Sequence, residues 1–422
     1  MHIFRRPAHP MRRRILWAVC SLAAVAGFSD PLSAQTAAAH YLPDGEVPVA
    51  LQELRRHVLD ANFNSLTFRS MDQLFDTRVV GRAGPVHALA RAETTLPDYE
   101  YKGHSYTTEQ FEARTFTNAL LVMREGRILH ESYRNNTSAE THFVSFSMAK
   151  SITSMLVGIA VDKGLIKSLD EKVTLYVPEL KGSGYENVSL RQLLQMRSGV
   201  DYMERYDFGD NPSPAAQVFE QTLVQSRRRF ADLAPSLKSK TRPGSAFNYS
   251  TMDTAVLGWA LERVVRQPIA AFMSQNLWEP AGMESYGYWL MDGPPGVGRE
   301  MNGMGFNATL RDFARLGQLM LDEGAVGGKQ LVSKEWVRLS TTMTPIETGA
   351  NRPHEGYGFQ WWRLDDSGAY AALGLQGQFI YVHPASRTVI VKLSFFPPGD
   401  SSDAQSESVA FFQAVTRTTV PH

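Results

Sequence analysis

The sequence predicts an α+β fold, an antiparallel sheet flanked by helices with a mainly helical domain inserted into it. Apolar runs typical of strands occur towards both ends, at 117–133 and 369–396. Between them, from 165 to about 290, the periodicity is mainly helical. The 422 residues are 43% hydrophobic, which is enough apolar side chain to offset the entropy of ordering a chain. A disordered protein is therefore excluded.

The predicted organisation has four parts, as follows: a signal peptide at 1–34, an irregular N-terminal segment at 35–115, an α/β domain at 116–164 and 291–422, and the helical domain at 165–290. The chain has 43 basic and 43 acidic side chains. Five arginines and one aspartate lie in the first 34 residues, so the remainder is mildly acidic. This charge argues against a nucleic-acid partner, which usually requires a basic patch or tail.

The N-terminus has the pattern of an export signal. The run ILWAVCSLAAVAGF follows Arg12–Arg14, and Leu32-Ser33-Ala34 is a small-x-small cleavage pattern. The run is shorter than the roughly 20 residues of a membrane-spanning helix, although an uncleaved anchor is the alternative. Cys20 is the only cysteine, so the mature chain has no disulfide and no thiol nucleophile. We expect a periplasmic or secreted protein that has no membrane contact after signal removal.

The first elements after the irregular segment are a hairpin and a helix. Two apolar runs flank Glu125-Gly126, which is a hairpin signature. A helix follows within 143–164, with four apolar residues on one face (Ile152, Met155, Leu156 and Ile159) and Gly164 at its C-terminal end.

The later elements are helices and then strands. Ser189 and Gln192 have the spacing of a capping box. Helical stripes occur at 249–265 and 308–324, the second opened by Thr309 and Asp312. The chain then returns to strands at 369–384 and 388–396, joined by a turn at Ala385-Ser386.

Ser147-Met148-Ala149-Lys150 is the only Ser-x-x-Lys sequence in the chain, and it opens an apolar helix. The spacing puts the Ser147 hydroxyl and the Lys150 amine on one helical face. Apolar surroundings and a helix N-terminus both lower the pKa of a lysine, so a neutral amine could accept the serine proton. The pattern indicates a nucleophile and its base. The alternative is an N-cap serine with a solvated lysine one turn later.

Two further motifs lie downstream. Tyr249-Ser250-Thr251 lies at a loop–helix junction, where a phenol whose pKa is lowered by cations can transfer a proton; the alternative is a packed aromatic. The second, residues 372–378, is a predicted strand interrupted by Gly374 and Gly377. Glycine lets a substrate backbone approach a strand closely, although a simple bulge is the alternative.

These motifs, in this order, resemble those of the serine β-lactamase and penicillin-recognising hydrolase superfamily. The resemblance is strongest to the class C-like branch, which includes 6-aminohexanoate-dimer hydrolases and related esterases. It covers most of residues 60–400 and includes four more segments, which are IAVDKGLIKSLDEKVTLYVPEL, SLRQLLQMRSGVDY, GFNATLRDFARLGQLMLDEG and the Gly-Leu-Gln-Gly-Gln strand. It implies a β-lactamase-like fold with Ser147 as nucleophile, Lys150 as base and Tyr249 as proton shuttle. The backbone N–H groups of Ser147 and Leu375 would form the oxyanion hole.

The sequence departs from the family pattern at two places. Thr251 stands where the family has the asparagine that grips the acylamino group of a β-lactam. Ala372 stands where a lysine or histidine binds the substrate carboxylate. Both losses favour a small ester or amide substrate. A shift of the strand by one register would instead place Gln376 or Gln378 at the oxyanion position.

Other motifs carry no predicted role. There is no Gly-x-Ser-x-Gly elbow and no metal-ligand spacing, so His104, His130 and His142 are interpreted as structural. Residues 303–308 mimic a dinucleotide fingerprint but follow a proline-rich loop, so we expect a turn. Three aromatic residues could line an acyl pocket or simply pack, namely Phe359, Trp361 and Trp362.

The sequence therefore predicts an exported serine hydrolase that acts on a small-molecule ester or amide through an acyl-enzyme, without cofactor or metal. A β-lactamase or D-alanyl peptidase is one alternative. A non-catalytic binding or regulatory protein on the same fold is the other.

Overall fold

The computed structural model describes residues 46–205, 211–293, 296–346, 356–398 and 401–417. The predicted signal peptide at 1–34 lies outside these ranges, and its removal stays a prediction. Within them, no helix has both the length and the apolar character that crossing a bilayer requires.

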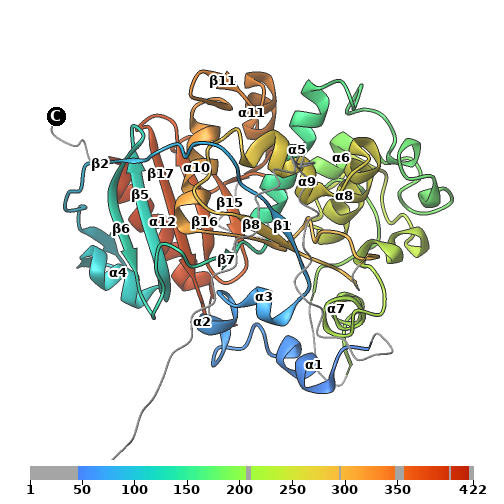
Figure 1. The fold of residues 1–422 in the computed structure, drawn as a ribbon, viewed down its shortest axis with the longest axis horizontal. Helices are drawn as coiled ribbons and strands as arrows, with labels where there is room; N and C mark the ends of the chain where they lie inside the picture. The colour runs from blue at the N-terminus through green and yellow to red at the C-terminus, as the bar shows by residue number, and fades with distance from the viewer. Residues whose placement is uncertain (1–45, 206–210, 294–295, 347–355, 399–400, 418–422) are drawn as a thin grey trace, which may run out of the picture. The chain divides into compact units, whose positions relative to one another are not determined.

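The largest sheet of the described residues has nine strands, in the order β12-β13-β14-β15-β16-β17-β5-β6-β2, and several of them are seen on the left of Figure 1. Its neighbouring strands are antiparallel except for the parallel pair β2 and β6. A second sheet has the order β1-β8-β9-β7, and β3-β4 and β10-β11 are separate pairs. The strand bounds are β1 Thr77–Val80, β2 Ala90–Arg91, β3 Tyr99–Tyr101, β4 His104–Tyr106, β5 Thr117–Arg124, β6 Arg127–Tyr133, β7 Phe143–Val144, β8 Gly287–Leu290, β9 Phe306–Ala308, β10 Ala325–Val326, β11 Lys329–Gln330, β12 Thr344–Pro345, β13 Gly356–Tyr357, β14 Trp362–Arg363, β15 Tyr370–Gly374, β16 Gln378–His383 and β17 Thr388–Ser394.

The helices lie on both faces of this sheet and beside it. Their bounds are α1 Val49–Arg56, α2 Asn64–Thr67, α3 Met71–Leu74, α4 Thr108–Arg114, α5 Met148–Asp162, α6 Leu190–Leu194, α7 Pro214–Phe219, α8 Thr251–Val265, α9 Ile269–Met273, α10 Leu310–Leu321, α11 Lys334–Thr341 and α12 Ser401–Arg417. Short 3-10 or π turns are η1 Val173–Leu175, η2 Pro178–Leu180, η3 Glu220–Val224, η4 Phe230–Ser236 and η5 Ser274–Trp278. The observed mixture of helices and antiparallel strands confirms the predicted α+β class.

The two faces of the large sheet bury different side chains. On β5, Leu121 belongs to the hydrophobic cluster that contains the buried residues of α5 and α10, whereas Leu120 and Val122 belong to the cluster that contains those of α12. This alternation follows from the period of two along a strand. Helices α5 and α10 therefore cover one face and α12 covers the other. Helix α5 also contacts α8, which joins the sheet to the helices shown on the right of Figure 1.

Local sequence signals account for several elements. β5 and β6 form the predicted hairpin around Glu125-Gly126. The capping box of Ser189 and Gln192 opens α6, and the Thr309 side chain caps α10. Between 165 and 286 the described residues form helices, turns and isolated bridges but no named strand. The division into separate domains stays a prediction.

Two expectations need correction. Residues 46–115, expected to be irregular, contain α1–α4 and β1–β4. They are ordered because their apolar side chains enter the core, Phe68 and Phe111 among them. The single strand expected at 369–384 is a hairpin of β15 and β16. The chain reverses there because Gln376 and Gly377 have φ values of +55° and +91°.

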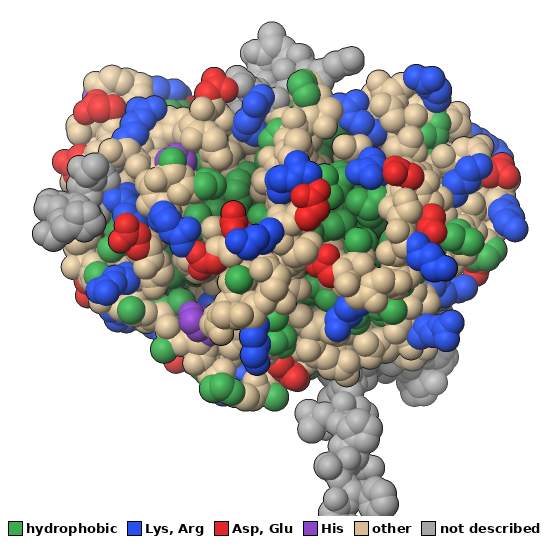
Figure 2. Space-filling view, turned by 90° about the horizontal axis from the view of Figure 1, so that it is seen from above, with side chains coloured by type: hydrophobic (Ala, Val, Ile, Leu, Met, Phe, Trp, Pro, Cys, Tyr) green, Lys and Arg blue, Asp and Glu red, His purple; other side chains and the backbone are tan. Residues whose placement is uncertain are grey.

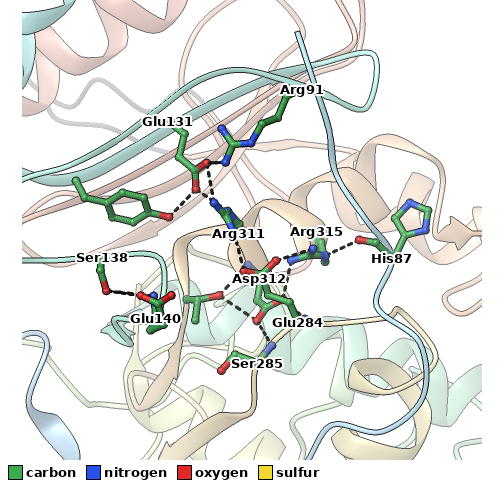
Figure 3. A network of polar contacts seen from close by, with 12 residues as sticks. His87, Arg91, Glu131, Ser138, Glu140, Glu284, Ser285, Arg311, Asp312 and Arg315 are labelled. Carbon is green, nitrogen blue, oxygen red and sulfur yellow. Dashed lines mark hydrogen bonds and ion pairs between the residues drawn. The ribbon is translucent and has the colours of Figure 1, made fainter. Parts of the chain in front are cut away.

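A network of ion pairs links α10 to β2 and β6 of the nine-stranded sheet and to the loop before β8 (Figure 3). Arg311 Nε donates to Glu131 Oε1 on β6 at 2.6 Å, and Arg91 on β2 also contacts Glu131. One turn later, Arg315 bonds Asp312 at 3.0 Å and Glu284 at 2.8 Å. Because Arg315 and Asp312 are buried, removing one partner would leave an uncompensated charge. The network therefore holds α10 in one position relative to β6 and the loop before β8.

A close contact between α5 and α11 gives a stability prediction. A Cβ on Gly158 would lie 2.5 Å from the buried ring of Trp336. Gly158→Ala should lower the free energy of unfolding by about 1–3 kcal/mol, the usual cost of overpacking, as measured by denaturant titration. Gly81→Ala is the control, because its Cβ would have its nearest neighbour at an ordinary 3.5 Å. Equal stability of the two variants would contradict this packing.

Candidate active site

A constrained turn precedes Ser147. Strand β7 pairs with β9, and the Ser145 N–H donates to the Phe306 carbonyl at 2.7 Å. Phe146 then adopts φ +40°, which is unusual for a bulky residue and is found mainly where the surroundings enforce it. Its ring packs edge-on against Phe68 at 4.7 Å between centroids. Ser147 follows as the N-cap of α5, partly exposed between buried neighbours.

Lys150 faces Ser147 from the first turn of α5. Its Nζ lies 3.1 Å from Ser147 Oγ, within hydrogen-bonding distance. The Lys150 side chain is only 1% exposed, and burial lowers its pKa to about 8 even though the negative charge of Glu204 acts to raise it. The Ser147 side chain makes no capping hydrogen bond to α5. Neither part of the alternative interpretation, a capping serine and a solvated lysine, therefore applies.

Two residues contact Lys150, and a third reaches it through one of them, in ways that the sequence did not lead us to expect. Its Nζ also donates to Thr251 Oγ1 at 2.9 Å and to the Gly303 carbonyl at 2.8 Å. Thr251 in turn donates its hydroxyl to Glu204 Oε1 at 2.6 Å and its backbone N–H to Glu204 Oε2. The motif at 303–308 is a turn, as expected, followed by β9. The carbonyl of Gly303, the first residue of this motif, is the one that contacts Lys150.

Tyr249 lies over the same amine. Lys150 Nζ is 4.8 Å from the centroid of the Tyr249 ring, whose other neighbours include Tyr357 and Trp362. Burial and the charge of Glu204 raise the pKa of Tyr249 well above its usual value, and interaction with Ser147 only partly opposes this. The expectation that cations lower the pKa of this phenol is therefore wrong. Tyr249 is a neutral phenol that can donate its proton.

The end of β15 lies against the turn before Ser147. A Cβ on Gly374 would lie 2.2 Å from the Ser145 carbonyl oxygen, so only glycine allows this approach. Leu375, the next residue, is 49% exposed, at the start of the turn to β16. The side chain of Gln376 points away to Asn64 and the Leu59 carbonyl, and that of Gln378 bonds the Ser394 carbonyl. These contacts account for both glutamine side chains, and the assignment of the oxyanion position to Leu375 stays a prediction.

Ala372 is fully buried in the core on β15, paired with Ile380. A lysine would not fit there without displacing its neighbours. Three aromatic residues had no predicted role, and two of them pack elsewhere. Phe359 packs against Trp336, and Trp361 packs against Tyr370. Trp362 alone of the three contacts a candidate site residue, Tyr249.

The histidines have local partners or surface positions. His130 contacts Glu112 at 3.0 Å, His142 contacts the Tyr286 carbonyl at 2.8 Å, and His104 is exposed on β4. In the part of the chain that the structure describes, no group of three metal-binding side chains is found.

Two surface features lie apart from this site. A hollow of about 870 Å³ is bordered by α1 and α7, with Arg56, Phe219 and Arg228 in its lining, and it includes none of the residues around Lys150. On the face drawn in Figure 2, basic and acidic side chains are interspersed rather than gathered by sign.

Comparisons with known proteins show the family to which the chain belongs. Residues 90–412 match the family model described as Beta-lactamase. The chain is 31% identical to the 6-aminohexanoate-dimer hydrolase of Paenarthrobacter ureafaciens, over 81% of this chain and 88% of the relative. It is 28% identical to Esterase EstB of Burkholderia gladioli, over 42% of this chain and 48% of the relative.

A solved structure of a Bacillus anthracis protein, provisionally named 6-aminohexanoate-dimer hydrolase, superposes with a TM-score of 0.76 at 23% identity, over 85% of this chain and 95% of that one. The hydrolase EstCE1 superposes with a TM-score of 0.59 at 17% identity, over 72% and 94% of the two chains. The chain therefore belongs to the beta-lactamase family and is a hydrolase of that fold, related to 6-aminohexanoate-dimer hydrolase and to esterases.

Proposed function

We propose that the protein is an exported serine hydrolase that cleaves small, uncharged esters or amides through an acyl-enzyme. The observation that carries the proposal is the 3.1 Å contact between Ser147 Oγ and the buried amine of Lys150. Because burial lowers the pKa of Lys150 to about 8, a substantial fraction of this amine is neutral near physiological pH. A neutral amine beside a hydroxyl is the arrangement that activates a serine nucleophile.

In the first step, Ser147 Oγ attacks the substrate carbonyl and its proton passes to Lys150 Nζ. The oxyanion would accept hydrogen bonds from the backbone N–H groups of Ser147 and Leu375. Each such donor typically contributes 10²–10³ in rate. The close approach of Gly374 to Ser145 supports this role for Leu375, because it brings the end of β15 to the nucleophile.

In the second step, the leaving group departs with a proton. Tyr249 is suited to donate it, because its phenol is neutral and lies beside both Lys150 and Ser147. Tyr249 then recovers a proton from the Lys150 ammonium. Water attacks the acyl group by the reverse sequence of proton transfers and releases the acid.

The charges around the site favour an uncharged substrate. Ala372 provides no cation for a substrate carboxylate, and it is buried. The Glu204 carboxylate is linked to Lys150 through Thr251, so a negative charge already lies next to the reacting groups. A substrate carboxylate would be desolvated there without a partner. This argues against a dedicated β-lactamase or D-alanyl peptidase.

Ser147→Ala tests the nucleophile. We expect the variant to lose both covalent labelling by a fluorophosphonate probe, detected by mass spectrometry, and hydrolysis of p-nitrophenyl butyrate. It should remain folded, because the Ser147 side chain makes no capping hydrogen bond. Ser406→Ala, at an exposed position on α12, is the control and should keep both activities. Wild-type hydrolysis by Ser147→Ala would refute the assignment, and a wild-type protein that neither labels nor hydrolyses would indicate a non-catalytic protein.

A matched pair of esters tests the substrate class. p-Nitrophenyl butyrate and mono-p-nitrophenyl glutarate share a leaving group, but the second carries a carboxylate on its acyl chain. We expect kcat/KM to be at least about tenfold higher for the neutral ester, corresponding to about 1.4 kcal/mol of transition-state stabilisation. A chromogenic cephalosporin should also be a poor substrate. A preference for either anionic substrate would contradict this reading and favour a β-lactamase or peptidase.

A further inference from the structure

The hydrogen bonds of Lys150 constrain where its lone pair can point. A neutral amine has two N–H bonds and one lone pair. The Gly303 carbonyl, 2.8 Å from Nζ, can only accept a hydrogen bond. One N–H of the Lys150 amine must therefore point at this carbonyl. The other two neighbours of the amine, Ser147 Oγ and Thr251 Oγ1, are hydroxyls that could each donate or accept.

Glu204 removes this ambiguity for Thr251. A hydroxyl has a single proton, and that of Thr251 is donated to Glu204 Oε1 at 2.6 Å. A carboxylate accepts but does not donate, and the second oxygen of Glu204 takes the backbone N–H of Thr251. This two-point contact fixes the carboxylate against Thr251. Thr251 Oγ1 must therefore accept the second N–H of Lys150, and the lone pair is left facing Ser147.

We infer that Glu204 is a positioning residue, which acts through the Thr251 hydroxyl to aim the lone pair of Lys150 at Ser147. The inference rests on the proposed function, in which Lys150 is the base. Without the carboxylate, Thr251 could donate its proton to Lys150 and compete with Ser147 for the lone pair. Glu204 itself touches neither the nucleophile nor the amine in this arrangement.

The same three contacts of Nζ also satisfy the ammonium that forms when Lys150 accepts the proton. When the proton moves from Ser147 Oγ to Lys150 Nζ, the ammonium has three N–H bonds and faces three acceptors: Ser147, Thr251 and Gly303. No other bond changes. The charge of Glu204 favours this ammonium, because it raises the Lys150 pKa against the effect of burial. Together with burial, the larger cause, the charge of Glu204 also raises the pKa of Tyr249 and of Asp253 in the first turn of α8.

The test compares four single variants and one double variant with the wild type by measuring kcat/KM for p-nitrophenyl butyrate from about pH 6 to pH 10, on either side of the Lys150 pKa of about 8. Glu204→Gln and Thr251→Val should each lose about 10–10²-fold, the scale of a misdirected catalytic group. Thr251→Ser keeps the hydroxyl and should restore most of the activity that Thr251→Val loses. Asp201→Asn is the charge control, because its exposed carboxylate contacts Lys240 and not Thr251.

Two readouts separate positioning from a merely structural role. The acidic limb of the pH profile should move to lower pH in Glu204→Gln, because removing the carboxylate lowers the pKa of Lys150. The double variant Glu204→Gln/Thr251→Val should lose no more than either single variant, because both break one pathway. Thermal unfolding checks that the variants are folded.

Wild-type kinetics in Glu204→Gln would overturn the inference, and so would a loss that is uniform with pH and additive with Thr251→Val. In either case, loss of labelling in Ser147→Ala would leave the proposed function standing. If Ser147→Ala retained full activity, the proposed function itself would fail.

Discussion

The amine of Lys150 lies in the protein interior, where a charged group lowers the stability of the fold unless each of its N–H groups has a hydrogen-bond acceptor. Helix α5 supplies the lysine and the serine, the start of α8 supplies Thr251, and the turn before β9 supplies the Gly303 carbonyl. These elements must hold their relative positions for the amine to remain satisfied. The requirement connects the large sheet, the small sheet and the helical region at a single atom.

The packing of the fold meets this requirement. Helix α5 lies between β15 and α8, and the contact of Gly158 with Trp336 fixes its outer side. Gly374 brings β15 against the Ser145 carbonyl at the other end of α5. The ion pairs of α10 hold this helix, which lies on the same face of the large sheet as α5, in position. Close contacts of this kind leave little room for α5 to shift, so the distances from Lys150 to Thr251 and to the Gly303 carbonyl are set by the scaffold.

The parts of the site that depend on local sequence could be predicted. The spacing of Ser147 and Lys150 on one apolar helix indicated their contact, and the hairpin and capping signals of β5, β6 and α6 were also local. The register at Leu375 stayed open in the sequence, because the turn that follows β15 was not predicted. The roles assigned to Ser147, Tyr249 and Leu375 remain proposals.

The contacts that tune the lysine could not be predicted. Glu204 is 47 residues from Thr251, and Gly303 is 153 residues from Lys150. Neither contact produces a periodic or motif-like signal, because the tertiary fold alone brings the residues together. For the same reason the pKa of Tyr249 was misjudged. The sequence suggested nearby cations but showed neither the burial nor the carboxylate that dominate.

The central claim is that the scaffold holds Lys150 as a base of lowered pKa. The direct measurement is an NMR titration of the Lys150 side chain in protein labelled with carbon-13 and nitrogen-15, with the signal assigned by its loss in Lys150→Arg. We expect a midpoint near about 8. A midpoint at the ordinary lysine value of 10.5 would contradict the account, because the amine would then be protonated at physiological pH and could not accept the proton of Ser147.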